Sequence, residues 1–252
     1  MTAIETGLRR LPLDGAVNFR DLGGYQTADG RRLRWGRVFR SDSLAELSAA
    51  DLAQLAGLGL HTVCDLRGEP EREHKPNQTL GAAITTHAIG FMPQGGDALL
   101  ADARGGSAGP AEIERRVQDI YRSFVVEQSA SFARLLQLIA EPDALPLVYH
   151  CTSGRDRTGF ATAMLLSALG VPQVVIEADY ELSNDYRRDL TFQVGGLVAP
   201  EVMAALTQAH PSYLAAAYAA IEAQHGSTER YLREGLGLSA DTRARLEMQL
   251  LE

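Results

Sequence analysis

One segment of the chain combines residue types that together bind and transfer phosphate. It reads His150-Cys151-Thr152-Ser153-Gly154-Arg155-Asp156-Arg157-Thr158-Gly159, so five residues separate a cysteine from an arginine. The apolar run 145–149 before it predicts a buried strand, and apolar residues on all sides of 158–169 predict a buried helix. A loop between a strand and a helix N-terminus can turn its backbone N–H groups inward, and such a nest binds phosphate oxygens. The spacing therefore predicts a phosphate-binding loop that begins with a cysteine.

The surroundings of Cys151 favour the thiolate, because loop amides, the helix N-terminus and two guanidinium groups all place positive potential there. Arg157, in the first helical turn, can hold two phosphoryl oxygens with its planar fork. Thr158 is expected to donate its hydroxyl to the sulfur when a phosphocysteine intermediate breaks down. We expect the substrate to be bound by Thr152, Ser153, Gly154, Arg155 and Thr158. Such a loop supplies electrostatic stabilisation itself, so we expect neither a metal nor another cofactor.

The elements around this loop alternate between strands and helices. Short apolar runs predict strands over 62–66 and 84–89, and apolar residues at three- and four-residue spacing predict helices. The expected helices run from the N-cap Ser48 through Leu55 and over 111–126, 129–140 and 202–223. The glycine-rich stretch 92–110 is expected to form a mobile lid or a helical insertion. This pattern predicts an α/β fold with a helical C-terminal third.

Composition limits the possible functions. The 252 residues are expected to form one domain, 1–252, and 45% apolar content allows a sizeable core. A net charge of −8 argues against general binding to nucleic acids or to membrane surfaces, because both are polyanions. No signal peptide or membrane-spanning segment is recognised, and the two cysteines suit a reduced compartment. We therefore expect a cytoplasmic protein; composition does not predict its oligomeric state.

The central segment resembles the CX5R signature of the protein tyrosine phosphatase superfamily. It is most similar to the HCxxGKDRTG loop of the atypical bacterial tyrosine and phosphoinositide phosphatases. Four further landmarks of that family occur in the same order, namely Asn18-Phe19-Arg20-Asp21-Leu22-Gly23-Gly24, Phe39-Arg40-Ser41-Asp42, Asp65-Leu66-Arg67 and Asp179-Tyr180-Glu181-Leu182-Ser183-Asn184. The resemblance spans essentially the whole chain. It implies a central, mostly parallel sheet flanked by helices.

The resemblance also implies an activity, phosphomonoester hydrolysis through a phosphocysteine at Cys151. Phosphotyrosine is the expected substrate, with phosphoserine and phosphothreonine as further substrates and phosphoinositides as the alternative. Arg155 is a departure, because the family usually carries lysine there and associates that charge with acidic or inositide substrates. The charge is kept, but a compact ammonium becomes a planar fork. Protein and lipid substrates therefore both stay open.

Two positions compete for the role of general acid. Asp156 lies inside the loop, and related lipid phosphatases are thought to use such a residue to protonate the leaving oxygen. Many tyrosine phosphatases instead take the acid from a separate mobile loop, which here would offer Asp97 or Asp102. Asp156 is favoured, although geometry decides such roles.

Several further residues are expected to support the loop without touching the substrate. We expect His150 to orient the loop and support the thiolate, and Arg20, Asp21 and Asp65 to brace it from outside. Cys64 in its predicted core strand is expected to be a small packed side chain. A reversible disulfide between Cys64 and Cys151 is the alternative hypothesis.

Two other functions fit part of the pattern. A phosphate-binding module without catalysis would keep the loop, but the nucleophile, the arginine and Thr158 are all present. Sulfur transfer by a rhodanese-like enzyme also uses a cysteine in a cradle loop, although that loop is usually shorter. A cysteine-dependent phosphatase is therefore the favoured interpretation.

Overall fold

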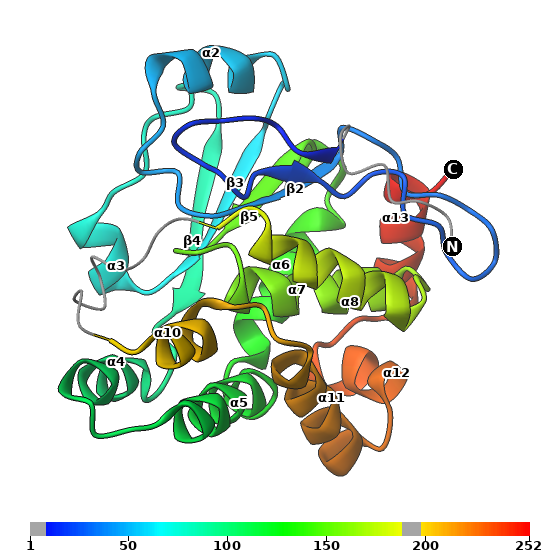
Figure 1. The fold of residues 1–252 in the computed structure, drawn as a ribbon. Coiled ribbons are helices and arrows are strands. Elements are labelled where there is room, and N and C mark those ends of the chain that lie inside the picture. The colour runs from blue at the N-terminus through cyan, green and yellow to red at the C-terminus, as the bar shows by residue number, and fades with distance from the viewer. Residues whose placement is uncertain (1–8, 188–197) are drawn as a thin grey trace.

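The computed structural model describes residues 9–187 and 198–252, and a five-stranded sheet lies at its centre (Figure 1). The strands run in the order β1-β2-β5-β3-β4. Their bounds are β1 Arg20–Asp21, β2 Val38–Ser41, β3 Thr62–Arg67, β4 Thr85–Phe91 and β5 Leu147–His150. Strands β2, β5, β3 and β4 pair in parallel, and only β1 pairs antiparallel. The expected α/β fold with a mostly parallel sheet is confirmed.

Register brings the expected site residues to one edge of the sheet. His150, the last residue of β5, pairs with Ser41 at the end of β2 and with Asp65 near the end of β3. Carboxyl ends of neighbouring parallel strands meet at one edge, where ligands of α/β proteins commonly bind. The loop that begins at Cys151 therefore leaves the central strand of the sheet at this edge.

Helices cover both faces of the sheet. Their bounds are α2 Ala49–Ala56, α3 Glu69–His74, α4 Gly96–Gly105, α5 Pro110–Val126, α6 Ser129–Ile139, α7 Asp156–Ala168, α8 Gln173–Glu181, α10 Pro200–Thr207, α11 Pro211–His225, α12 Thr228–Arg230 and α13 Ala240–Leu250. Short 3₁₀ turns lie at Pro142–Ala144 and Leu182–Asn184, and a π turn lies at Tyr231–Gly235. Figure 1 shows α2 above the sheet and α5, α10 and α11 below it. Within the described ranges, none of the helices is both long and apolar enough to span a membrane.

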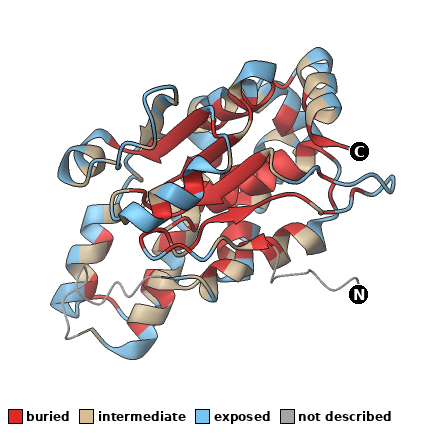
Figure 2. Cartoon of the chain, turned by 90° about the horizontal axis from the view of Figure 1, so that it is seen from above, coloured by how far each residue is buried: buried red, intermediate tan, exposed pale blue. Residues whose placement is uncertain are grey.

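The core is divided by the sheet into two clusters. The larger one packs the buried helix α7 against α5 and α6, with Phe124, Phe132 and Phe160 in mutual ring contact. The smaller one lies on the side of α2 and includes Phe19 and Phe39. Figure 2 shows the consequence: β1, β2, β3 and β5 are buried, while the edge strand β4 and the outer faces of the helices are at least partly exposed. The loop at the end of β5 is thus held between two packed layers.

Helix α2 begins where the sequence predicts it. The Ser48 hydroxyl accepts a hydrogen bond from Asp51 N at 3.1 Å, and the Asp51 carboxylate accepts one from Ser48 N at 2.9 Å. This reciprocal pair is a capping box, which satisfies two otherwise free N–H groups. Asp51 also accepts hydrogen bonds from Asp14 N and Gly15 N, both at 2.9 Å. The cap therefore also fixes the chain that leads into β1.

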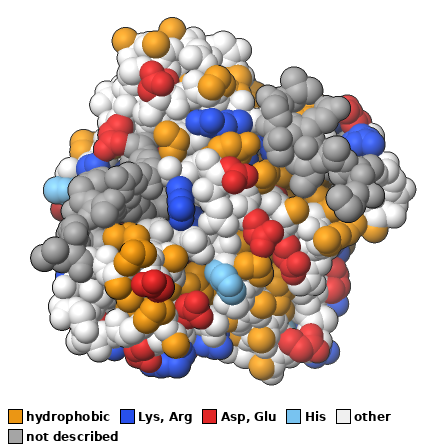
Figure 3. Space-filling model, viewed as in Figure 1, with side chains coloured by type: hydrophobic (Ala, Val, Ile, Leu, Met, Phe, Trp, Pro, Cys, Tyr) orange, Lys and Arg blue, Asp and Glu red, His pale blue; other side chains and the backbone are white. Residues whose placement is uncertain are grey.

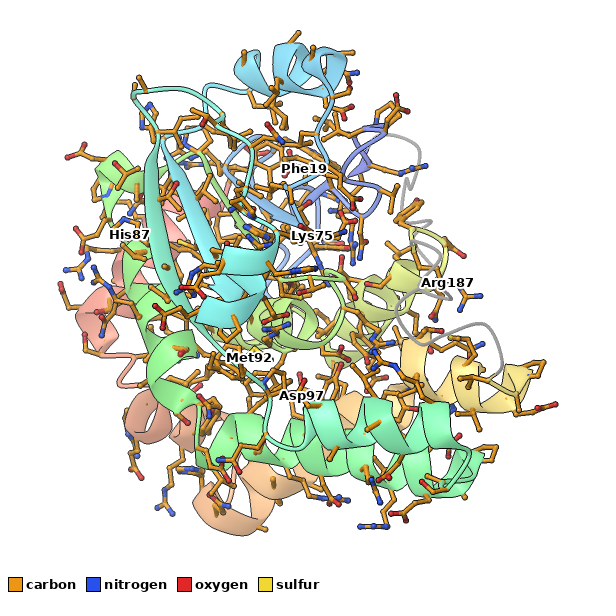
Figure 4. The ribbon with its side chains drawn as sticks, turned by 90° about the vertical axis from the view of Figure 1, so that its left-hand side faces the viewer. Phe19, Lys75, His87, Met92, Asp97 and Arg187 are labelled. Atoms are coloured by element: carbon orange, nitrogen blue, oxygen red, sulfur yellow. The ribbon has the colours of Figure 1, made fainter. Side chains whose placement is uncertain are left out.

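Between β4 and α5 the structure contains a helix, α4, so the predicted insertion is helical. Leu99 and Ala103 are buried on its inner side, and Asp102 forms an ion pair with Arg116 on α5 at 2.5 Å. Figure 4 labels Met92 and Asp97 along the segment that leads from β4 into α4. Glycines concealed the helix from the sequence pattern, because they are poor helix formers.

The alanine-rich stretch 202–223, which was expected to be helical, lies in two helices. Helix α10 ends at Thr207, and α11 starts at Pro211. Proline cannot donate a backbone hydrogen bond and suits the first turn of a helix, so α10 cannot continue through it. His210 caps the new helix through its side chain, which accepts from Ser212 N.

A buried ion network joins α8 to the sheet. Asp179 lies 3.1 Å from Arg20 Nε, forms a short ion pair with Arg40, and accepts a hydrogen bond from Tyr25 at 2.8 Å. The side chains of Asp179 and of both arginines are fully buried. Burial opposes ionisation of Asp179, but Arg20 and Arg40 outweigh it and hold its pKa well below the usual range. This carboxylate therefore balances two buried cations.

We predict that Asp179→Asn lowers the free energy of unfolding by about 3 kcal/mol, because it leaves two buried guanidinium groups without their counter-charge. Since the pKa of Asp179 is lowered on folding, its contribution is complete at neutral pH and is lost as the pH falls below about 4. Urea denaturation at several pH values measures both effects. Asp241→Asn removes an ion pair whose carboxylate is 79% exposed, and it should change stability little. Equal losses in the two variants would contradict the network's role.

Candidate active site

The carbonyl oxygens of the loop are bound one after another by the surrounding scaffold. The hydrogen bonds are His150 Nδ1 to Cys151 O (3.1 Å), Ser43 N to Thr152 O (3.1 Å), Asn18 Nδ2 to Ser153 O and to Gly154 O (3.2 Å each), Arg40 Nη2 to Gly154 O (2.7 Å) and Gly159 N to Arg155 O (2.7 Å). In the described part of the chain, the N–H groups of residues 152–155 have no protein acceptor. With its carbonyls bound from outside, the loop has amides available for an anion.

Gly154 allows the loop to lie this close to the sheet. Its φ is +64°, a conformation that favours glycine. A Cβ atom there would lie 2.7 Å from Asp42 N and 2.8 Å from both the Ser41 carbonyl carbon and Asn18 Nδ2. Space and backbone conformation both exclude a side chain, so glycine at this position shapes the cradle.

Cys151 is the first residue after β5 and is 2% exposed. Helix α7 starts five residues later at Asp156, and its orphan N–H groups and positive dipole end stabilise negative charge at the loop. The expected arrangement of strand, cysteine, cradle and helix is thus present.

Arg157 is paired with Glu71, a residue that the sequence did not single out. Both Glu71 oxygens accept from the guanidinium, Oε1 from Nη2 at 2.8 Å and Oε2 from Nη1. Arg157 Nη1 also donates to Phe91 O at 2.9 Å, and the Thr152 hydroxyl donates to Glu71. Burial opposes the charge of Arg157, but the pairing with Glu71 outweighs burial and raises its pKa. The guanidinium that we expect to hold phosphate is therefore held beside the loop by an internal carboxylate.

A positional signal for Glu71 was present in the sequence. Glu71 follows β3, the strand beside β5, by four residues, so it lies at the same edge of the sheet as Cys151. The acidic run around it looks like ordinary charge in the first turn of a helix, which favours the helix dipole. Only tertiary structure shows that it contacts the arginine of another loop.

Asp156 is held by donors from its own loop and from α5. Arg155 Nε donates to Asp156 Oδ1 at 2.9 Å and Nη2 donates to Oδ2 at 2.8 Å, while the Tyr121 hydroxyl donates to Oδ1 at 2.9 Å. Arg155 Nη1 reaches Leu206 O in the last turn of α10 at 2.7 Å. The planar guanidinium donates to both carboxylate oxygens of Asp156 and, with its third nitrogen, to α10. A lysine ammonium has a single nitrogen and could not make these three contacts in the same geometry. The departure from lysine therefore links the loop to α10.

The alternative acids lie in helix α4. Asp102 pairs with Arg116 and accepts from the Ser107 hydroxyl at 3.0 Å, and these contacts lower its pKa. Asp97 is exposed at the start of α4 (Figure 4). Asp156 is the candidate that belongs to the cradle itself, and its role as the acid stays a prediction.

His150 lies beneath the loop and is fully buried. Its Nδ1 donates to Cys151 O, so Nε2 must accept, and Asn77 Nδ2 lies 3.0 Å from it. Asp65 Oδ2 is 3.5 Å from the same nitrogen and is paired with Arg67 at 2.7 Å. Burial lowers the pKa of His150, which keeps the ring neutral near pH 7. Asn77 is a second contact that the sequence did not reveal.

The two neighbouring residues Arg20 and Asp21 make contacts with different parts of the protein. Arg20 donates to Asp179 and to the Asn18 side chain, and Asn18 in turn binds the loop carbonyls. Arg20 therefore supports the loop indirectly, through Asn18. Asp21 accepts from Gly23 N at 2.7 Å and from Gly36 N at 2.6 Å. Among the described residues it has no hydrogen bond to the phosphate loop. Instead of bracing the loop, as expected, it orders the turn between β1 and β2.

Two contacts considered for the Cys151 sulfur, one with Thr158 and one with Cys64, are not present among the described residues, and both stay predictions. The Thr158 hydroxyl lies 3.5 Å from Ser41 O and has no hydrogen bond to Cys151. Cys64 and Cys151 are both free thiols. Cys64 is fully buried beside Tyr149, and burial raises the pKa of its thiol to about 12. Cys64 therefore packs in the core as a small side chain. A disulfide with Cys151 stays a prediction.

Acidic, basic and hydrophobic side chains all occur on the face of the molecule that Figure 3 shows. The net charge of −8 is thus accompanied by basic side chains on this face.

We predict that Gly154→Ala lowers turnover of a phosphate monoester by about a hundredfold, because the added Cβ displaces the loop by a fraction of an ångström or more. Circular dichroism and thermal unfolding should show that the variant still folds. Gly105→Ala is the matched control, since a Cβ there meets no atom within 4 Å. Unchanged turnover in Gly154→Ala would contradict the geometry described for the cradle.

Comparison with known proteins agrees with this geometry. The model of the tyrosine phosphatase family matches residues 11–252. A Cupriavidus necator relative named as a tyrosine-protein phosphatase is 37% identical over 238 residues, covering 91% of this chain and 85% of the relative. The Mycobacterium tuberculosis triple specificity protein phosphatase PtpB is 33% identical over 283 residues, covering 97% and 99%. The solved structure of P. aeruginosa TpbA matches with a TM-score of 0.32 and 18% identity over 74% of this chain and 98% of that one. Because the family model and both curated relatives span nearly the whole chain, the protein belongs to the tyrosine phosphatase family and is a hydrolase of that type.

Proposed function

We propose that this phosphatase hydrolyses phosphotyrosine in proteins, with phosphoserine and phosphothreonine as further substrates, through a phosphocysteine at Cys151. The observation that carries the proposal is the cradle itself, with carbonyls bound outward, amides free and Cys151 at its start. The name of the Mycobacterium tuberculosis relative describes a protein phosphatase of more than one specificity, and the two chains align over nearly their whole lengths. That relative supports a similar range of substrates here.

Each proposed step assigns one role to one group. The Cys151 thiolate attacks phosphorus, an S–P bond forms, and the electron pair of the breaking P–O bond goes to the leaving oxygen. Asp156 protonates that oxygen, while the loop amides and Arg157 hold the other phosphoryl oxygens. Water then attacks phosphorus, gives its proton to Asp156, and the S–P bond breaks to return the thiolate. Phosphate and the free tyrosine hydroxyl are the products.

In this scheme Glu71 is the residue that pairs with Arg157 before substrate binds. A phosphoryl dianion in the cradle would offer the guanidinium a second bidentate partner beside Glu71. Because Glu71 accepts from both Arg157 and Thr152, it keeps the fork of Arg157 next to the loop before substrate arrives. Preorganised donors of this kind reduce the reorganisation needed in the transition state.

Phosphoinositide hydrolysis is the less favoured alternative. In the family the basic residue at position 155 is associated with inositide substrates, but here each nitrogen of the Arg155 guanidinium already donates to a protein acceptor. Three of its five N–H groups are used in this way, so a second substrate phosphate could bind only the one left on Nη1 and the one left on Nη2. Measured kcat/KM for matched phosphotyrosine, phosphoserine and phosphothreonine peptides and for soluble inositide phosphates distinguishes the two. A higher value for an inositide than for every peptide would overturn the proposal.

We predict that Cys151→Ser lowers hydrolysis of p-nitrophenyl phosphate by about a thousandfold or more, because the alcohol is a far weaker nucleophile than the thiolate. EDTA should leave the wild-type rate unchanged, since the scheme contains no metal-dependent step. Cys64→Ser is the matched control and should keep most of the activity, because Cys64 belongs to the core. Phosphate binding without Cys151-dependent hydrolysis would instead indicate a binding module.

A further inference from the structure

Tyr121 places a hydroxyl in the interior beside Asp156. It lies on α5, far from the loop in sequence, and its side chain is fully buried. Its oxygen lies 2.9 Å from Asp156 Oδ1 and 2.7 Å from the hydroxyl of Tyr180 on α8. A buried hydroxyl with two such partners is costly to leave unpaired, so its contacts constrain both helices.

The direction of these hydrogen bonds follows from the chemistry of the groups. An ionised carboxylate can only accept, so Tyr121 donates to Asp156 and Tyr180 donates to Tyr121. Burial is the main cause that raises the pKa of both tyrosines, and the negative charge of Asp156 raises it further. Both hydroxyls therefore keep their protons at neutral pH. The chain of donors therefore runs from Tyr180 through Tyr121 to the carboxylate.

The two oxygens of Asp156 are not equivalent. Oδ1 accepts from both the Tyr121 hydroxyl and Arg155 Nε, each at 2.9 Å, whereas among the described residues Oδ2 accepts from Arg155 Nη2 alone. The Asp156 side chain is 25% exposed, so it is not sealed from the solvent side of the loop. A protonated carboxyl needs one oxygen that donates. Oδ2 accepts from one donor and Oδ1 from two, so a proton on Oδ2 meets less competition. Oδ2 is therefore the oxygen that we expect to carry the proton.

We propose that Tyr121 is a positioning residue for the general acid: it holds Asp156 Oδ1 so that Oδ2 delivers its proton to the leaving oxygen. This inference rests on the proposed function. When the proton leaves Oδ2 and the P–O bond breaks, negative charge develops on the Asp156 carboxylate. The hydrogen bond from Tyr121 strengthens with that charge, so it stabilises the transition state more than the ground state.

Tyr121→Phe tests the proposal through the dependence of rate on the leaving group. We expect kcat for phenyl phosphate, whose phenolate leaves poorly, to fall about tenfold, because a hydrogen bond to a charged group is lost. For p-nitrophenyl phosphate, which leaves with little protonation, the loss should be small. Tyr213→Phe is the matched control, since its ring lies 6.0 Å from that of Tyr121 and its hydroxyl binds Ala205 O instead. It should affect both substrates alike.

The outcomes separate this inference from the proposed function. If wild-type hydrolysis does not depend on Cys151, the proposed function itself fails. If it does, equal losses on both substrates in Tyr121→Phe overturn the positioning role. Asp156→Asn should show a larger leaving-group effect than Tyr121→Phe, and the double variant should show no further effect. An additive double variant, or an Asp156→Asn variant insensitive to the leaving group, would equally overturn it.

Discussion

The pairing of one buried carboxylate with two buried arginines underlies the shape of the phosphate loop. Asp179 on α8 compensates Arg20 on β1 and Arg40 on β2, which could not stay charged in the interior without it. Arg40 then binds Gly154 O, and Arg20 binds the side chain of Asn18, which holds the same carbonyl. The outward direction of the loop carbonyls, and hence the availability of its amides, depends on a charge balance formed outside the loop.

Much of this arrangement could be predicted from the sequence because local patterns carried it. The apolar runs predicted the central strands, the N-cap Ser48 marked the start of α2, and the position of Cys151 between a strand and a helix indicated the cradle. The landmark around Asp179 could be recognised but not interpreted, since its partners lie more than a hundred residues away in the chain. A motif shows that a residue matters, whereas its contacts show how it acts.

The residues that escaped prediction share a physical reason. Glu71, Asn77 and Tyr121 contact the site through single side chains that come from other elements and belong to no local pattern. A glutamate in the first turn of a helix and a tyrosine on an apolar helix face both have ordinary explanations. Asp21 shows the reverse case, because its place in a recognised motif suggested a contact with the loop, whereas its hydrogen bonds go to a turn.

The pairing of Arg157 with Glu71 also affects how the protein responds to the ions around it. Before an anion arrives, Arg157 already has an internal counter-ion, so a monovalent ion such as chloride gains less from entering the cradle. A tetrahedral dianion such as a phosphate ester can add contacts with the loop amides that chloride cannot make. The glutamate therefore raises the number of contacts that an anion must form before it binds well beside Arg157.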